Sequence, residues 1–165
     1  MLKFREDISE HAKGVIIGNQ SRAVLISDLV ESCERNGYDV ERISDECFYS
    51  CGVAHSKDAP GENPDDFIRF MTSGNVEVFD KEIVKLDPEH SVARFNYCPL
   101  CAKWEEMGLP RERIAYLCDL ASKSDYGRAS NFENVVLSFP KRLACGDAYC
   151  ELDAKAKHSA SEESK

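Results

Sequence analysis

The chain has 165 residues, 42% of them hydrophobic, and a net charge of -9 at pH 7. This composition is that of a globular protein, and the charge disfavours nucleic acid and anionic membranes, which attract clustered Lys and Arg. The segment 1–17 is charged and lacks an apolar signal-peptide core, and no apolar run has the length of a membrane span. We therefore expect a cytoplasmic protein with reduced thiols, with one domain over 1–153 and a disordered tail over 154–165.

The N-terminal half has helical patterns. The first predicted helix ends near residue 36, and its expected core face consists of Leu25, Ile26, Leu29, Val30 and Cys33. A second helix is predicted over 39–54, where Cys47 and Cys51 are four residues apart and His55 continues the same row. These side chains either pack as ordinary helix residues or flank a metal or substrate site.

Strands and helices are predicted to alternate in the rest of the chain. A short helix begins near 63 and closes at 73–75, and strands follow over 76–86 and 91–98, with a turn at 87–90. The remaining predicted elements are helices over 99–107 and 111–124, a loop over 124–131, and strands over 133–145 and 149–153. This order predicts an α+β fold: a four-stranded antiparallel sheet covered on one face by helices, with a helical N-terminal half.

Cys98 stands at the junction between a predicted strand and a predicted helix. Pro99 follows it, and proline suits the first position of a helix while it keeps the preceding residue extended. Cys98 is therefore expected to cap the helix, where free backbone N–H groups and the helix dipole favour its thiolate. A thiolate can attack carbon or bind a metal, whereas a neutral thiol there would be a small apolar side chain.

The other cysteines leave several interpretations open. Cys98 and Cys101 form the chain's only C-x-x-C pair, so a zinc ribbon is not indicated. Cys118 is expected on the inward face of its helix, either as core or as part of a site. Cys145 and Cys150 are expected to face each other across a hairpin, as two metal ligands, a redox pair or plain packing.

The stretch from 95 to 153 contains motifs of a known family. They are Asn96-Tyr97-Cys98-Pro99, Glu105-Glu106-Met107-Gly108-Leu109, Tyr116-Leu117-Cys118-Asp119 and Cys145-Gly146-Asp147-Ala148-Tyr149-Cys150. Together they resemble the L-2-amino-thiazoline-4-carboxylic acid hydrolase family. The closing Gly-Asp-x-x-Cys also resembles the end of 4-vinyl reductase domains, which are α+β modules that bind small ligands. The N-terminal half shares only the general layout.

The resemblance implies shared thiols at Cys98, Cys118 and Cys150. The family often has a Glu four residues after the first Cys and an acid three residues after the second, but this chain has Ala102 and Ala121 there. These departures bear on the reaction or its substrate. Cys101 and Cys145 are additional to the family pattern and point to metal binding.

The resemblance also implies a hydrolase for a small heterocycle in which one amidine-like carbon is bonded to sulfur and nitrogen. Such hydrolysis needs a nucleophile and a proton for the leaving atom. Either Cys98 attacks directly, or a zinc or other transition-metal ion activates water. The expected metal ligands are Cys98, Cys118, Cys150 and Cys145.

Acid–base and substrate-binding groups are expected beside these thiols. His55 or Asp119 is a candidate general base, and Cys118 with Cys98 belongs to the expected catalytic set. Arg142 and Lys103 are candidate partners for a substrate carboxylate. Two other functions remain open: a non-catalytic small-ligand or metal-sensing domain of the 4-vinyl reductase type, and a protein whose cysteines hold zinc or an iron–sulfur centre for stability or electron transfer.

Overall fold

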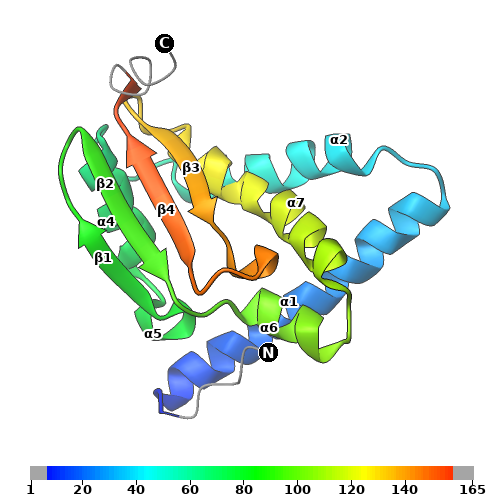
Figure 1. Ribbon diagram of the computed structural model, residues 1–165. Coiled ribbons are helices and arrows are strands. Elements are labelled where there is room, and N and C mark those ends of the chain that lie inside the picture. Colours follow the sequence, from blue (N-terminus) through cyan, green and yellow to red (C-terminus); the bar gives the residue numbers. More distant parts are fainter. Residues whose placement is uncertain (1–6, 158–165) are drawn as a thin grey trace.

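A computed structural model describes residues 7–157 of the chain (Figure 1). In chain order, the N-terminal part contains α1 (Glu10–Arg35), α2 (Val40–Ser44), a π-helical turn η1 (Asp45–Tyr49), α3 (Ser50–His55), α4 (Pro64–Ser73) and α5 (Val76–Phe79). The remainder contains β1 (Lys81–Lys85), β2 (His90–Phe95), α6 (Pro99–Glu106), α7 (Arg111–Ala129), β3 (Val136–Lys141), a 3-10 turn η2 (Leu143–Cys145) and β4 (Cys150–Lys155). No helix in this range is both long and apolar enough to cross a membrane.

The four strands form one antiparallel sheet in the order β1-β2-β4-β3. Side chains alternate between its two faces, so that Ala93 of β2 and its partner Leu152 of β4 are both buried on the inner face. There they pack against Phe67 and Ile68 of α4, which lies behind β1 and β2 in Figure 1. The predicted α+β fold, with a helical N-terminal half and a four-stranded antiparallel sheet, is confirmed.

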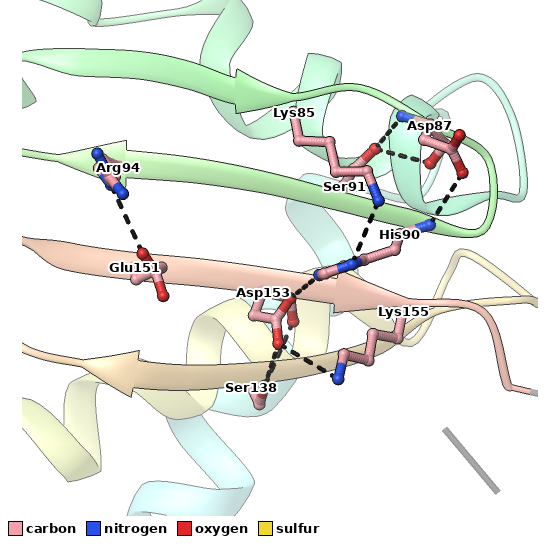
Figure 2. A network of polar contacts seen from close by, with 9 residues as sticks. All are labelled: Lys85, Asp87, His90, Ser91, Arg94, Ser138, Glu151, Asp153 and Lys155. Atoms are coloured by element: carbon pink, nitrogen blue, oxygen red, sulfur yellow. Dashed lines mark hydrogen bonds and ion pairs between the residues drawn. The ribbon is translucent and has the colours of Figure 1, made fainter. Parts of the chain in front are cut away.

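The outer face of the sheet is polar (Figure 2). His90 of β2 contacts the carboxylate of Asp153 on β4, and Arg94 pairs with Glu151 at 3.5 Å between the same two strands. Because opposite charges on neighbouring strands favour one register, these pairs fix the alignment of β2 with β4. Within residues 7–157, the helix that packs on the sheet core, α4, covers the opposite face, in line with the prediction.

Helix α6 packs against α1 in a second part of the core. Trp104 is fully buried, and its indole N–H donates to the carbonyl oxygen of Ala23 at 2.9 Å. The buried face of α1 includes Ile26 and Val30, as predicted, but Leu25 and Leu29 are more than half exposed, which corrects that part of the expected core face. The apolar stripe on α1 is wider than the surface that α6 and α7 cover, so its outer residues Leu25 and Leu29 remain exposed.

Several element boundaries differ from the predictions. The segment expected to open a strand at 76 instead forms the short helix α5, and only then does the chain enter β1. Helix α7 continues through the predicted loop after Ser124, and Gly127 inside it lies against the backbone of Tyr49, where a Cβ would collide. Although glycine is a poor helix former, Gly127 is therefore the residue that lets α7 pack closely against the turn that contains Tyr49.

The C-terminal hairpin also differs in detail. Strand β3 ends at Lys141, and the residues to Cys145 form a 3-10 turn instead of extending the strand. Strand β4 continues to Lys155, past the boundary at 153 predicted for the domain, and Ala156 is fully buried. The rest of the predicted tail, 158–165, lies outside the described residues.

Candidate active site

A cavity of about 610 Å³ lies between the inner face of the sheet and the helices. All four strands contribute to its wall, together with α1, α3, α4, α5, α6 and α7. Much of the lining is aromatic, including Phe48, Phe70, Phe79, Phe95 and Phe139. A volume of this size and a largely apolar wall with a few polar groups are typical of small-molecule sites.

Cys98 lines this cavity at the N-terminal end of α6. Its backbone is extended (φ -135°, ψ 114°), it is the N-cap residue, and Pro99 is at the first helical position. The predicted N-cap is therefore confirmed, although the strand expected to run to Cys98 ends at Phe95. The thiol faces the cavity at the end of the helix where the dipole favours negative charge.

Cys101 determines the acidity of Cys98 more than any other group. A hydrogen bond from the Cys101 side chain lowers the pKa of Cys98, and the backbone amides of Cys101 and Leu100 add to this effect, whereas burial opposes it. The pKa of Cys101 itself is raised because its thiol interacts with Cys118 and Cys98 and is buried. Cys98 is therefore the more acidic thiol of the pair.

Cys118 and Cys150 complete the set of cavity thiols. Cys118 lies on α7, lines the cavity and interacts with Cys101. Cys150 accepts a hydrogen bond from the amide of Leu143 at 3.3 Å, and burial raises its pKa to about 12. Cys98, Cys118 and Cys150 thus line one cavity, as the prediction of a shared pocket requires.

Two other predicted site residues lie elsewhere. Cys145 is exposed in the η2 turn and does not line the cavity, because the strand expected to carry it toward Cys150 ends earlier. Asp119 points outward from α7 and pairs with Arg142 at 2.8 Å. Arg142 does line the cavity, so Asp119 acts on the site through that guanidinium and not by contact.

His55 lies at the cavity wall next to Cys51, one turn earlier on α3. Its Nδ1 is 2.7 Å from the carbonyl oxygen of Cys51 and 3.4 Å from the sulfur of Cys51. The short contact to a carbonyl favours a proton on Nδ1, which leaves Nε2 as the acceptor. Both side chains are exposed, so they belong to the rim of the cavity.

The structure adds an acidic residue that the sequence reasoning missed. Asp125 lies in the cavity wall, paired with Arg128 at 2.7 Å. Burial raises the pKa of Asp125, and the neighbouring Arg128 acts in the opposite direction. The spacing of Cys118, Ser122 and Asp125 marks one helical face, which becomes visible once α7 is known to continue beyond residue 124.

The cavity is rich in positive charge although the protein is acidic. Its charged lining residues, within the described range, are Arg22, Lys81, Arg128, Arg142 and a single acid, Asp125, beside the rim residue His55. The ammonium of Lys81 donates to the carbonyl oxygens of Met71 and Gly74, and burial lowers its pKa to about 8. Lys103, the other cation suggested by the sequence, pairs with Glu106 and does not line the cavity. This charge balance favours an anionic ligand.

The metal-ligand prediction receives no geometric support. Among residues 7–157, no group of three or more His, Cys, Asp or Glu side chains is arranged to hold a metal ion. Three of the four predicted ligands share the cavity, but Cys145 does not. Metal binding by these cysteines therefore stays a prediction.

The sequence model of one protein family, described as L-2-amino-thiazoline-4-carboxylic acid hydrolase, matches residues 19–153. The chain belongs to this family. The match covers most of the helical half as well as the cysteine motifs, so this hydrolase family accounts for the whole cavity-forming region. No curated protein matches the chain significantly.

Two solved structures resemble this member of the hydrolase family in fold. One is trafficking protein particle complex subunit 3 from Naegleria fowleri, covalently bound to palmitic acid, with 15% sequence identity, 86% of this chain and 96% of that chain covered, and a TM-score of 0.57. The other is the phenol-responsive sensory domain of the transcription activator PoxR with phenol, with 12% identity, 88% and 80% coverage, and a TM-score of 0.47. At these identities the likeness concerns the fold alone.

Proposed function

We propose that the protein is a hydrolase that opens a small sulfur–nitrogen heterocycle, such as 2-amino-thiazoline-4-carboxylate, with Cys98 as the nucleophile. The observation that carries the proposal is the position of Cys98: a helix-capping thiol of lowered pKa in the wall of a cavity. Family membership supplies the reaction class. A thiolate is the form of cysteine that attacks carbon.

The positive lining of the cavity suits such a substrate. The heterocycle carries a carboxylate, and Arg142, Arg128 and Lys81 are the cavity cations that can pair with it. Arg142 is the best placed of these. Its partner Asp119 is half exposed and binds the guanidinium on the solvent side, so that the guanidinium can also face the cavity. Arginine can hold a carboxylate by two parallel hydrogen bonds, which also orients the ring.

The chemistry then proceeds in two steps. The thiolate of Cys98 adds to the amidine-like ring carbon, and the ring carbon–sulfur bond breaks, since a thiolate is a better leaving group than an amine nitrogen. The product of this step is a covalent adduct on Cys98 with a free substrate thiol. Water then adds to the same carbon and Asp125 accepts a proton from it, after which the bond to Cys98 breaks and the thiolate returns. Both water protons stay in the product: the one accepted by Asp125 passes to the released substrate sulfur, and the other ends on the former amidine nitrogen, which leaves an open-chain urea with a free thiol.

Asp125 suits the role of proton acceptor. The raised pKa of its carboxylate makes it a stronger base than an exposed aspartate. It also interacts electrostatically with Cys98, raising that thiol's pKa slightly against the dominant effect of Cys101, so the two groups face the same space. In this proposal Asp125 takes the role for which the sequence suggested His55 or Asp119.

The proposal is tested by turnover of 2-amino-thiazoline-4-carboxylate, measured as release of substrate thiol. Wild-type protein and Cys145→Ser, which alters an exposed thiol outside the cavity, are expected to release it, whereas Cys98→Ser is not. Mass spectrometry of acid-quenched wild-type protein should show the adduct on Cys98. Full turnover by Cys98→Ser, or no turnover by the wild type, contradicts the proposal.

A second candidate function is non-catalytic binding of a small apolar ligand. The phenylalanine-rich wall of the cavity favours it, and the Naegleria fowleri protein of similar fold holds a covalently bound palmitic acid. Trp104 is the chain's single tryptophan and lines the cavity, so its fluorescence reports occupancy. Saturable quenching by palmitate, without turnover of the thiazoline, would favour this function over hydrolysis.

A further inference from the structure

We propose that Cys98 and Cys101 form a redox-active dithiol, which a low-molecular-weight disulfide oxidises to an intramolecular Cys98–Cys101 bond. This property is separate from hydrolysis and does not depend on it. If Cys98 is the hydrolytic nucleophile, as proposed above, the oxidised protein is inactive until a thiol reduces it. The cavity would then hold a nucleophile that the redox state of the surroundings turns on and off.

The arrangement of the two thiols carries the inference. Cys98 caps α6 and Cys101 lies in the first turn of the same helix, so the pair has C-x-x-C spacing at a helix N-terminus. Both side chains line the same cavity, and residues three apart on a helical turn are neighbours. Pro99 between them fixes the start of the helix, which holds Cys98 extended and Cys101 helical.

The two thiols also differ in the way that a reactive pair requires. Cys98 is partly accessible from the cavity, whereas Cys101 is 1% exposed. An accessible thiolate that attacks first and a buried thiol that attacks second are the roles needed in disulfide exchange. The cavity of about 610 Å³ provides the route by which a small disulfide reaches Cys98.

The exchange balances as follows. The Cys98 thiolate attacks one sulfur of the small disulfide, and the first small thiolate leaves. The sulfur of Cys101 then attacks Cys98 in this mixed disulfide and expels the second small thiolate, which receives the Cys101 proton. The two cysteines lose two electrons, and the small disulfide gains them to become two thiols.

Cys118 is the other cysteine with which Cys101 could form a disulfide. It also interacts with Cys101, so a Cys101–Cys118 bond between α6 and α7 is the alternative product. We expect the Cys98–Cys101 bond instead, because Cys101 lies buried and protonated and reacts only after Cys98 has been activated. The sequence separates these products: trypsin releases residues 95–103 with both Cys98 and Cys101, and residues 114–123 with Cys118.

The experiment treats the native, reduced protein with glutathione disulfide, alkylates the remaining thiols under denaturing conditions, and maps the tryptic peptides by mass spectrometry. The expected product is peptide 95–103 lighter by two hydrogens, carrying neither alkyl group nor glutathione, and dithiothreitol should restore two alkylatable thiols. The same treatment of Cys101→Ala should stop at a stable glutathione adduct on Cys98. Cys118→Ala should still form the bond and serves as the matched control.

Three outcomes would overturn the proposal. One is a crosslink between peptides 95–103 and 114–123, which would assign the bond to Cys118. Another is a glutathione adduct on Cys98 that persists in the wild type, which would show that Cys101 does not resolve it. The last is complete alkylation of peptide 95–103 after treatment, which would show that Cys98 does not react. Because the readout is a peptide mass in the wild type, it is independent of both folding of the variants and turnover.

Discussion

Cys98 caps α6, the nearly fully buried Cys101 lies in the first turn of the same helix, and both side chains line one cavity, where interaction with Cys101 is the largest cause that lowers the pKa of Cys98. This relationship makes the second cysteine of the pair responsible for the reactivity of the first. The backbone amides at the start of α6 act in the same direction but are secondary to the thiol. Cys101 thus tunes Cys98, although the resemblance implied shared thiols only at Cys98, Cys118 and Cys150.

Replacing Cys101 with Ala should make Cys98 a weaker acid. The loss of the donated hydrogen bond removes the largest cause of the lowered Cys98 pKa, while the burial that opposes it remains. Alkylation of Cys98 by iodoacetamide, followed against pH, should move to a higher midpoint than in the wild type. Cys145→Ala is the control and should leave the midpoint unchanged; a midpoint that does not move in Cys101→Ala would refute this account of the acidity.

Lys81 should impose a pH dependence on stability. Burial lowers its pKa from 10.5 to about 8, so between these values the unfolded chain holds a proton that the folded protein has released. The contribution of Lys81 to the free energy of unfolding therefore rises with pH across this window and is at its least favourable below pH 8. The unfolding free energy of the wild type minus that of Lys81→Met should increase from pH 8 to 10.5, as measured by urea denaturation; a flat or falling difference would count against it.

Gly127 should tolerate no larger residue. A Cβ at this position would collide with the backbone oxygen of Tyr49, where α7 crosses the π-helical turn η1, and neither backbone can move without displacing its helix. Gly127→Ala should therefore lower the free energy of unfolding by about 2 kcal/mol or more, which is the range for overpacked sites. Gly18→Ala on α1 meets nothing within 4 Å and should stabilise the helix by about 0.5–1 kcal/mol. Similar effects of the two substitutions would contradict the packing argument.

The sequence predicted the elements well where the signal was local. The N-cap at Cys98 follows from Pro99, and the inward face of β4 follows from the alternation that places Leu152 on the side of the core. The prediction failed where tertiary contacts decide. The segment 124–131 was predicted as a loop, but α7 continues through it to Ala129 and packs on Tyr49 at Gly127. Because the predicted helix ended at 124, Asp125 was left out of the site.

The convergence of the cysteines was predictable, but their roles were not. The resemblance grouped Cys98, Cys118 and Cys150 as shared thiols of one site, and they line one cavity. The interaction of Cys101 with Cys118 depends on how α6 packs beside α7, which no spacing in the chain encodes, whereas its nearness to Cys98 follows from the C-x-x-C spacing. Cys145 was misplaced because Pro140 and the following turn end β3 before it.

Arg142 should contribute to substrate binding more than to the chemical step. Arg142→Met removes a cavity cation that the proposed function pairs with the substrate carboxylate, and a charge-assisted hydrogen bond contributes about 1.5–3 kcal/mol. We expect KM for 2-amino-thiazoline-4-carboxylate to rise at least about tenfold, with a smaller change in kcat. Lys103→Met is the matched control, because Lys103 pairs with Glu106 outside the cavity. Equal effects of both substitutions on KM would show that the cavity cations do not select the substrate.

Asp125→Asn should impair turnover without impairing the reactivity of the nucleophile Cys98. The amide cannot accept the proton of water, and a general base contributes about 10²–10⁴-fold to a rate, so kcat/KM should fall by about that factor. Alkylation of Cys98 should not slow, because Asp125 raises the pKa of that thiol and the substitution removes its charge. The wild-type kcat/KM should rise with pH as Asp125, whose pKa burial raises, loses its proton, and this step should be missing from the variant's profile.

Asp28→Asn provides the control for that experiment, because Asp28 is an exposed aspartate on α1 outside the cavity and should leave both measurements unchanged. Turnover at the wild-type rate in Asp125→Asn would remove Asp125 from the mechanism. Slower alkylation of Cys98 in the same variant would mean that the substitution disturbs α7 and the thiols packed on it, because the loss of a nearby negative charge by itself favours the thiolate. Only lost turnover with undiminished alkylation fits a carboxylate that acts on water after Cys98 has attacked.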